Sequence, residues 1–337
     1  MVNDLDKIFQ DILKLKVAVV GDVMLDTYWW GNVDRISPEG PVPVVALTKR
    51  ELRIGGAGNV GLNVRALATD VAILSVIGKD EEGEQLKNLL QNNKIDTRFI
   101  LRSDKRMTTN KIRIIGRNQQ MLRLDAERTN DLENADEEQL IYHLEQYIQS
   151  EKPQVIILQD YNKGVLTERI ITKVIELCNE HKIISTADPK RKNFFAYKNI
   201  TLFKPNFKEV KESLHILSEE INEDLLSEIH QRLSEKLQHG ISLITLSEKG
   251  IFYQDGIEGN IIPAHIRNIA DVSGAGDTVI AVASLLYAVT KNIRLTAEVA
   301  NIAGGLVCEE VGTAAINEQK LREECNQLLK PLSPDGE

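Results

Sequence analysis

The apolar and polar positions of the chain follow two recurring patterns, one typical of buried strands and one typical of helices. Val17 to Val20 is an uninterrupted apolar run of the kind that forms a strand buried on both faces, and similar runs occur at Val71 to Ile77 and Val155 to Leu158. Between such runs, apolar residues recur at helical spacing, as from Glu81 to Gln91 and from Thr167 to Glu180. This alternation predicts an α/β fold, a doubly wound, mainly parallel sheet with helices on both faces.

Two segments interrupt the alternation. Between about residues 27 and 53, three prolines among scattered valines predict short strands and turns in place of a crossover helix. Between about residues 106 and 125, Lys111 to Ile114 and Met121 to Leu124 alternate on either side of a turn at Gly116 to Asn118. We interpret both segments as a small β-lid inserted over the mouth of the main sheet. A small sheet with open edges and an apolar face favours pairing with a second copy, so we expect a homodimer joined through the lids.

The rest of the sequence is typical of a single acidic domain. No linker rich in Pro, Ser or Gly divides the chain, so we expect one domain over residues 1–330 and a mobile tail at 331–337. The formal net charge of −9, with acids and bases interspersed, argues against binding to nucleic acid or to an anionic membrane. The three cysteines have neither disulfide nor zinc spacing, and neither a signal peptide nor a bilayer-length apolar run is evident. These features predict a cytoplasmic protein.

The chemistry is concentrated in a turn of small residues, 273–276, directly before an apolar run of helical length at 278–289. Such a turn presents unpaired backbone N–H groups and the positive end of the helix dipole, which together bind anions. An acid in the first turn can take a proton from a hydroxyl that attacks a phosphorus atom, while the amides hold the developing charge. It can also simply complement the helix dipole, and the pattern leaves both roles open. The candidates are Asp277 as base and Gly274, Ala275 and Gly276 as anion hole.

Polar residues also follow several of the predicted strands. Because the carboxyl ends of parallel strands meet at one rim of a sheet, we expect these residues to lie close together. Asn206 and Glu209 are one helical turn apart, a spacing that suits hydrated Mg²⁺ and phosphate oxygens. The same spacing suits a helix cap with a reciprocal partner, and the sequence does not separate the two. The groups at strand ends are Asp22 with Asp26, Asp160 to Gly164, Asp188 to Lys190, Lys204 to Glu209, and Thr245 to Gly250.

A glycine-rich stretch formally matches the GxGxxG pattern of dinucleotide-binding proteins at Gly56, Gly58 and Gly61. That fingerprint should follow a buried strand, whereas the residues before it, 50–53, are mostly charged. The context therefore argues against a nicotinamide cofactor. A double glycine before a helix, with Asn59 in the first turn, would instead let a polyhydroxylated ligand lie against backbone and amide.

The stretch from Asp271 to Ile280 resembles the C-terminal signature of the ribokinase (PfkB-type) carbohydrate kinases, in which the last residue of a Gly-Ala-Gly-Asp motif is the catalytic base. The resemblance extends over nearly the whole chain, and the lid motifs are most similar to those of the heptose 7-phosphate kinases. The other matching segments are Gly21 to Asp26 with Tyr28, Arg35 to Glu39, Pro41 to Val45, Gly55 to Ala57 with Asn59 and Val60, Arg117 to Gln120 with Arg123 to Asp125, Asp160 with Tyr161, Lys163 with Gly164, and Asp188 to Lys190.

The resemblance implies a ribokinase-like fold, ATP as phosphoryl donor, Mg²⁺, and in some members K⁺. It implies that Asp277 is the base and that the site divides into three parts. The sugar hydroxyls would be held by Asp26, Gly55, Gly56, Asn59 and Asp160, and the substrate phosphate by Lys163, Arg35, Arg117 and Arg123. The nucleotide would be held by Lys204, Asn206, Thr245, Glu248, Gly250 and Asn301, Mg²⁺ by Asn206 and Glu209 through water, and a monovalent cation by Asp271.

The activity that the resemblance implies is ATP-dependent phosphorylation of the anomeric hydroxyl of D-glycero-D-manno-heptose 7-phosphate to the 1,7-bisphosphate, a step toward ADP-heptose and the lipopolysaccharide core. The alternatives are a kinase of another sugar or sugar phosphate, and a non-catalytic sugar or nucleotide sensor on the same fold. Two departures stand out. Ala57 occupies a position where related sugar sites often have lysine, and the His-x-Gly-His motif of the nucleotidyltransferase half found in bifunctional relatives does not occur in this sequence.

Overall fold

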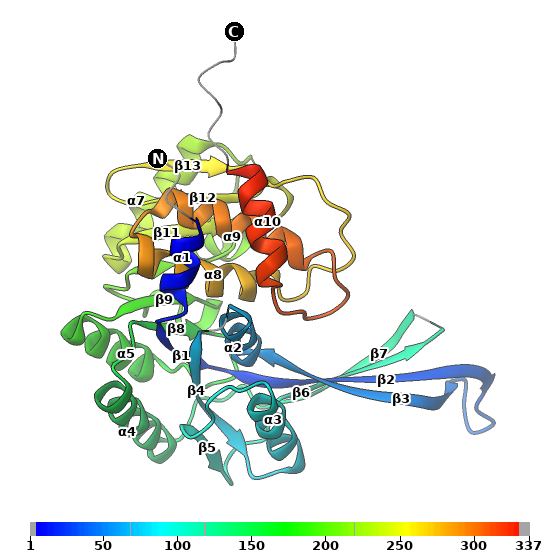
Figure 1. Cartoon of the computed structure of the whole chain (residues 1–337). Helices are drawn as coiled ribbons and strands as arrows, with labels where there is room; N and C mark the ends of the chain where they lie inside the picture. Colours follow the sequence, from blue (N-terminus) through cyan, green and yellow to red (C-terminus); the bar gives the residue numbers. More distant parts are fainter. Residues whose placement is uncertain (1–4, 68, 118, 219, 330–337) are drawn as a thin grey trace.

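The computed structural model describes residues 5–67, 69–117, 119–218 and 220–329, and it consists of a large α/β body with a long β arm (Figure 1). The predicted tail at 331–337 and Asn118 of the predicted turn lie outside the described residues. Nine strands form the central sheet of the body in the order β13-β12-β11-β10-β9-β8-β1-β4-β5. The strands are β1 (Lys16–Gly21), β4 (Asp70–Gly78), β5 (Ile100–Ser103), β8 (Val155–Gln159), β9 (Ile184–Asp188), β10 (Leu202–Phe203), β11 (Ile241–Thr245), β12 (Ile251–Gln254) and β13 (Gly259–Ile262).

All neighbours in this sheet run parallel except at one edge, where β12 pairs antiparallel with both β11 and β13. Helices cover both faces, as the alternation of strand and helix patterns predicted. One face carries α1 (Leu5–Ile12), α2 (Ala57–Ala66), α3 (Glu81–Asn92), α8 (Ala275–Thr290), α9 (Ile293–Val307) and α10 (Glu318–Leu328). The other carries α4 (Asn134–Glu151), α5 (Glu168–His181), α6 (Phe207–Leu214) and α7 (Glu223–Leu237).

The central strand β1 shows why the sheet has two cores. Its side chains alternate between the faces, so Val17 and Val19 join the core under α8 and α9, whereas Ala18 and Val20 join the core under α4 and α5. All four are almost completely buried. An uninterrupted apolar run is therefore required at this place, and the predicted α/β fold is confirmed.

The arm is a second sheet of four strands in the order β3-β2-β6-β7. It is built from β2 (Val23–Ile36), β3 (Pro43–Gly56), β6 (Asn110–Gly116) and β7 (Gln119–Ala126), which contain most of the two predicted lid segments. The expectation of short strands was wrong for β2 and β3. Each has 14 residues, so the arm is about 45 Å long at the usual rise of a strand.

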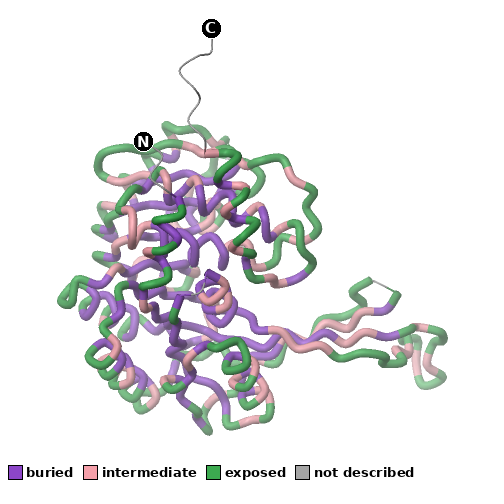
Figure 2. Tube along the Cα trace, in the orientation of Figure 1, coloured by how far each residue is buried: buried purple, intermediate pink, exposed green. Residues whose placement is uncertain are grey.

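Irregular pairing lets β2 and β3 stay together over this length, and the sequence pattern does not show it. The register of β2 against β3 shifts at Trp30/Gly31 and again at Val33/Arg35, and such bulges let the two strands stay paired while the arm twists. Of the prolines, Pro38 and Pro41 lie in the connection, and Pro43 is the first residue of β3, where no interior ladder bond is lost. Apart from Gly31 and Gly116, the buried residues of the arm lie where it joins the body (Figure 2).

The loop that follows β8 is fixed to the body by a buried carboxylate, that of Asp22. Its oxygens accept hydrogen bonds from the backbone N–H groups of Tyr161 (2.9 Å), Lys163 (3.0 Å) and Val165 (3.0 Å). Burial raises the pKa of Asp22, while these three bonds oppose that shift. The sequence suggested Asp22 as a ligand-binding acid, but in the fold its oxygens are engaged by the chain itself. Among the described residues, no helix has the length and apolar character needed to cross a bilayer.

We predict that Asp22→Ala lowers the free energy of unfolding by roughly 2–4 kcal/mol, because three buried N–H donors lose their acceptor. Asp70→Ala is the matched control. The Asp70 side chain is 81% exposed and meets only Arg65, so its loss should change stability by less than about 0.5 kcal/mol. Urea denaturation followed by circular dichroism measures both. Equal effects of the two substitutions would contradict the anchoring role of Asp22.

Candidate active site

Helix α8 begins with an uncapped turn at the carboxyl rim of the sheet. Gly274, its N-cap, has φ +83°, the left-handed region that favours glycine, and no side chain caps the helix. A Cβ at this position would lie 2.8 Å from Nδ2 of Asn59, so the close approach of α2 also requires glycine. Among the described residues, the N–H of Ala275 donates to the carbonyl of Val272 (3.3 Å), and the other N–H groups of the first turn of this 16-residue helix, with its dipole, are available to an anion.

Asp277 lies in the first turn of α8 and is almost completely buried. Its Oδ2 accepts a hydrogen bond from Nδ2 of Asn59 (2.8 Å). Its Oδ1 accepts from the hydroxyl of Tyr161 (2.7 Å) and from Nε2 of Gln159 (3.1 Å). Burial raises the pKa of Asp277 to about 6, although the bonds from Asn59 and Tyr161 act in the opposite direction. A carboxylate with such a pKa is mostly ionised at neutral pH and basic enough to accept a proton.

A cavity of about 510 Å³ opens in front of α8 and Asp277. Its volume is within the range usual for small-molecule sites. All residues predicted for the base, the anion hole and the nucleotide contribute to its wall. They are Asp277, Gly274, Ala275, Gly276, Lys204, Asn206, Thr245, Glu248, Gly250 and Asn301.

Two lysines bring positive charge to this cavity. Lys204, whose side chain is 3% exposed, places Nζ 3.0 Å from Oδ2 of Asp188. Lys190 places Nζ 2.5 Å from Oε1 of Glu209 and 3.7 Å from Oδ1 of Asp188. Burial alone would raise the pKa of Asp188, but Lys190 and Lys204 outweigh it and lower the pKa. Asp188 is therefore a fixed anion that holds both cations beside the cavity.

Asn206 and Glu209 form the reciprocal helix cap that was one of the two predicted roles. Oδ1 of Asn206 accepts from the N–H of Glu209 (2.8 Å), and Oε2 of Glu209 accepts from the N–H of Asn206 (2.9 Å). The same carboxylate also binds Lys190. Within the described part of the chain, no group of three or more His, Cys, Asp or Glu side chains is arranged to hold a metal ion. A metal ion here would meet one amide and one carboxylate that already hold the cap and Lys190, so it would take most of its ligands from water and phosphate.

Asp271 connects the two loops in front of α8. Its oxygens accept from the backbone N–H groups of Ser273 (2.9 Å) and Gly312 (2.9 Å). Burial would raise its pKa, but the bonds from Ser273 and Gly312 lower it. Asp271 is therefore ionised and holds the turn before the anion hole.

The predicted sugar residues meet where the arm joins the body. Oδ1 of Asp26, on β2, is 2.5 Å from Nη1 of Arg113 on β6. A Cβ on Gly55 would lie 2.4 Å from Oδ2 of Asp26, so glycine makes room for that carboxylate. Gly56, at φ +60°, is the N-cap of α2, which carries Asn59 to Asp277. The structure thus brings Asp26, Gly55, Gly56 and Asn59 together beside the base.

Asp160 does not lie with them. Its carboxylate turns to the opposite face of the sheet, where it accepts from the hydroxyl of Tyr197 (3.0 Å) and the N–H of Asn162 (2.7 Å). Burial and the neighbouring Asp22 raise the pKa of Asp160 to about 7. Asp160 is not part of the cavity wall. The prediction that it binds a sugar hydroxyl has no support in this geometry, which gives it a role in shaping the loop.

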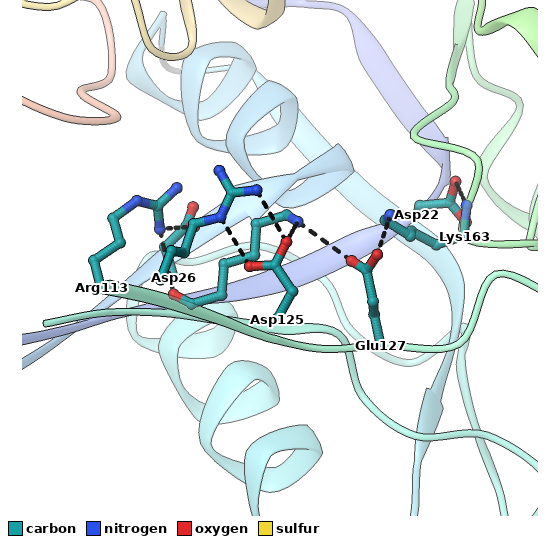
Figure 3. A network of polar contacts seen from close by, with 8 residues as sticks. Asp22, Asp26, Arg113, Asp125, Glu127 and Lys163 are labelled. Atoms are coloured by element: carbon teal, nitrogen blue, oxygen red, sulfur yellow. Dashed lines mark hydrogen bonds and ion pairs between the residues drawn. The ribbon is translucent and has the colours of Figure 1, made fainter. Parts of the chain in front are cut away.

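The residues predicted for the substrate phosphate are divided between the two ends of the arm. Lys163 lies at its base, where Nζ is 2.8 Å from Glu127, and Arg123 is bound to Asp125 (2.9 Å) (Figure 3). Arg35 lies at the far end of β2, about 30 Å from Asp26 at the rise of a strand. Arg117 is at the β6–β7 turn and donates to the carbonyl of Val33 (2.8 Å). Within one chain, Arg35 and Arg117 are remote from Asp277.

Two cations near the base of the arm were missed by the sequence analysis. Arg113 is bound to Asp26 and lies over the Tyr28 ring. Lys111 is bound to Asp125 (3.0 Å) and Glu127 (3.2 Å) and so joins the network of Lys163. Only the pairing of β2 with β6 brings them beside Asp26, and that pairing is not visible in the sequence.

Lys190 and Tyr161 were expected among the strand-end groups but given no role, and Gln159 was missed, although the sequence held a signal for Gln159 and Tyr161. They are two residues apart at the end of a buried strand, so their side chains lie on the same face. Gln159 is also a fully buried polar residue that ends an apolar run. The intervening Asp160 lies on the other face, which is why the acid is remote from the site and its neighbours are not.

Comparison with known proteins identifies the family. The sequence pattern of the pfkB family carbohydrate kinases matches residues 14–320. The bifunctional protein HldE of Aliarcobacter butzleri (strain RM4018) is 38% identical over 321 residues, which cover 95% of this chain and 66% of the relative. The protein of the same name from Helicobacter pylori (strain HPAG1) is 37% identical over 321 residues, covering 95% and 68%. The chain thus spans about two thirds of the length of these relatives.

Solved structures share the fold at low sequence identity. Phosphofructokinase-2 from Escherichia coli, in complex with potassium, has a TM-score of 0.75 at 16% identity and covers 94% of this chain and 100% of its own. Ribokinase from Arabidopsis thaliana, complexed with ribose and ATP, has a TM-score of 0.70 at 14% identity, covering 92% and 98%. Since the family pattern extends over most of the sequence and agrees with the fold, the chain belongs to the pfkB family of carbohydrate kinases.

Proposed function

We propose that the chain is an ATP-dependent kinase that phosphorylates the anomeric hydroxyl of D-glycero-D-manno-heptose 7-phosphate, giving the 1,7-bisphosphate on the route to ADP-heptose in the cytoplasm. The observation that carries the proposal is the buried carboxylate of Asp277 at the N-terminus of α8, in one cavity with Lys190 and Lys204. The similarity of the arm motifs to heptose 7-phosphate kinases supports the choice of sugar. A coupled ADP-release assay against heptoses and sugar 5-, 6- and 7-phosphates tests it.

The geometry suits an in-line transfer between two bound substrates. The sugar would lie at the base of the arm, against Asp26, Gly55 and Asn59, with its anomeric hydroxyl at Asp277. The nucleotide would occupy the cavity. Asp277 accepts the hydroxyl proton while the first amides of α8 and the two lysines stabilise the charge on the transferred phosphoryl group. Catalysis on this arrangement is mostly positioning and electrostatics.

The cations that we propose follow from the same residues. Asn206 and Glu209 would hold hydrated Mg²⁺ through water, and the ion would neutralise phosphate charge. Asp271, which is ionised and lies in the turn before α8, would bind a monovalent cation such as K⁺. The two backbone N–H groups remain bound to Asp271 when the cation is absent. We therefore expect loss of the cation to loosen the turn while the body stays folded.

We place the substrate phosphate at the base of the arm. The network there contains four cationic side chains, Lys111, Arg113, Arg123 and Lys163, and, besides Asp22, the acids Asp26, Asp125 and Glu127 (Figure 3). A phosphate can replace Glu127 as the partner of the two lysines, since both are flexible and strongly charged. The distal Arg35 and Arg117 are not needed for this site within one chain.

We predict that Asp277→Asn retains binding of nucleotide and sugar but lowers kcat by about 10²–10⁴-fold, because an amide cannot accept the hydroxyl proton. Steady-state kinetics and calorimetric titration of both substrates measure the two parts. The carboxamide keeps the acceptor for Asn59 or Tyr161, so the fold should be retained. A variant that keeps more than about a tenth of the native kcat would assign Asp277 to dipole complementation alone.

We predict that Lys163→Gln lowers kcat/KM for the heptose 7-phosphate by about 10- to 100-fold and leaves kcat/KM for the unphosphorylated heptose almost unchanged. A charge-assisted contact to phosphate contributes roughly 1.5–3 kcal/mol, and only the phosphorylated sugar has that contact. Arg117→Gln is the matched control at the far end of the arm and should leave both values unchanged. If Arg117→Gln gives the larger loss, the phosphate site is at the end of the arm and not at its base.

We predict a homodimer joined through the arms. A four-stranded sheet with open edges tends to pair with another chain. Exposed apolar side chains also gather on the arm and favour contact with a second copy. They are Ile36, Val42, Leu47, Met121, Leu122 and Leu124. Light scattering should give twice the chain mass of 37.8 kDa, and the double substitution Leu122→Glu and Leu124→Glu should give a single chain. Leu217→Glu, on the body and 94% exposed, is the control. A monomeric native protein would contradict this assembly.

A further inference from the structure

The three donors to Asp277 are distributed unequally between its oxygens. Among the described residues, Oδ1 accepts from the Tyr161 hydroxyl and from Gln159, whereas Oδ2 accepts from Asn59 only. A carboxylate oxygen offers two lone-pair positions. Oδ1 is therefore saturated by the protein, and one position remains open, on Oδ2.

The side-chain amides of Asn59 and Gln159 are fixed as donors to Asp277. Oδ1 of Asn59 and Oε1 of Gln159 are buried without a partner, and a flip of either amide would set a carbonyl against the carboxylate. Tyr161 differs because it also lines the cavity, where Lys190 lies 5.8 Å above its ring. Burial and the nearby Asp277 raise the pKa of Tyr161 far above its ordinary value. The phenol therefore keeps its proton and acts as a donor, not as a base.

We propose that Tyr161 is a positioning residue for the general base: with Gln159 it saturates Oδ1 of Asp277 and so makes Oδ2 the oxygen that accepts the proton of the sugar hydroxyl. This inference rests on the proposed function of Asp277. It assigns a direction to the transfer, since Oδ2 is the oxygen held by Asn59 from α2, beside the double glycine at the base of the arm. The attacking hydroxyl would thus approach from the side of the arm.

A consequence concerns the acidity of the base. The Tyr161 bond favours the charged carboxylate, so removing it should raise the pKa of Asp277 above its native value of about 6. The other charged groups around Asp277 are Asp188, Lys190 and Lys204 from the strand ends, and Asp26 from the arm acts on Tyr161. None of them is changed by Tyr161→Phe. A raised pKa means that the carboxylate is ionised only at higher pH, so activity should be lost first on the acid side.

The test is a pair of pH titrations on the full chain, native and Tyr161→Phe. In protein labelled with ¹³C at the aspartate carboxyl carbons, the Asp277 resonance is the one absent from Asp277→Asn. Its midpoint should move up by about one to two pH units in Tyr161→Phe. The acid limb of kcat should move by the same amount, so that kcat falls about 5- to 50-fold near pH 6 and recovers to within a few-fold of native near pH 9. The sugar KM should change little.

Tyr197→Phe is the matched control. It also removes a buried tyrosine hydroxyl from a buried aspartate, but its partner is Asp160, on the other face of the sheet. It should leave the Asp277 resonance and the acid limb in place. If Tyr197→Phe moves the limb and Tyr161→Phe does not, the titrating acid is Asp160 and the proposal is overturned. Gln159→Leu removes the second donor to Oδ1 and should shift the Asp277 midpoint upward too, which keeps the test available if Tyr161→Phe folds poorly.

The two readouts separate this inference from the proposed function. An unchanged Asp277 midpoint in Tyr161→Phe overturns the positioning role, whatever the chain phosphorylates. A shifted midpoint in a protein that turns over no sugar phosphate leaves the positioning of Asp277 supported and overturns the kinase assignment. A loss of kcat by the same factor at every pH would mean that Tyr161 acts only through packing, and that result also overturns the inference.

Discussion

The active rim depends on how four buried carboxylates are satisfied, because a carboxylate removed from water is unstable unless donors or cations replace the lost solvation. Asp22, Asp160, Asp188 and Asp277 are all 5% exposed or less. The first three lie at the ends of parallel strands or directly after them, and Asp277 lies in the first turn of α8. Each carboxylate has a different set of partners. Asp22 has three backbone N–H groups, Asp188 has two lysines, Asp160 has a tyrosine and a backbone N–H, and Asp277 has two amides and a tyrosine.

These different partners give the buried acids different pKa values. Cations in direct contact lower the pKa of Asp188 against the effect of burial, so it is a permanent anion that holds Lys190 and Lys204. Asp277 has only neutral donors in contact, so burial prevails and its pKa rises to about 6. Its neighbour through Gln159 is Asp188 itself, which also raises that pKa. An acid of raised pKa and a fixed counter-ion are therefore made from the same residue type, both bound to Gln159, through the choice of partners.

The sequence predicted much of this arrangement for physical reasons that differ from part to part. The α/β fold follows from uninterrupted apolar runs, since only strands buried on both faces need them, as β1 illustrates. The meeting of Asp188, Lys190, Lys204 and Thr245 in one cavity wall follows from strand ends, because parallel strands deliver their carboxyl ends to one rim. What the sequence did not give is strand pairing. The 14-residue arm, the position of Lys111 and Arg113 beside Asp26, and the distance of Arg35 and Arg117 all depend on register between β2, β3 and β6, which two bulges shift. Asp160 and Tyr161 lie on opposite faces because side chains alternate along a strand. The sequence analysis did not extend this alternation past the end of β8.

Gly274 shows how tightly these constraints meet at one residue. It must be left-handed for the turn to enter α8, and it must lack a Cβ so that Asn59 can approach. Any larger side chain would push Asn59 away and thereby remove the only donor that the described structure gives to Oδ2 of Asp277. The glycine that shapes the anion hole is therefore also what allows α2 to hold the base. Because α2 begins where β3 of the arm ends, the same contact links the position of the arm to the geometry of proton transfer.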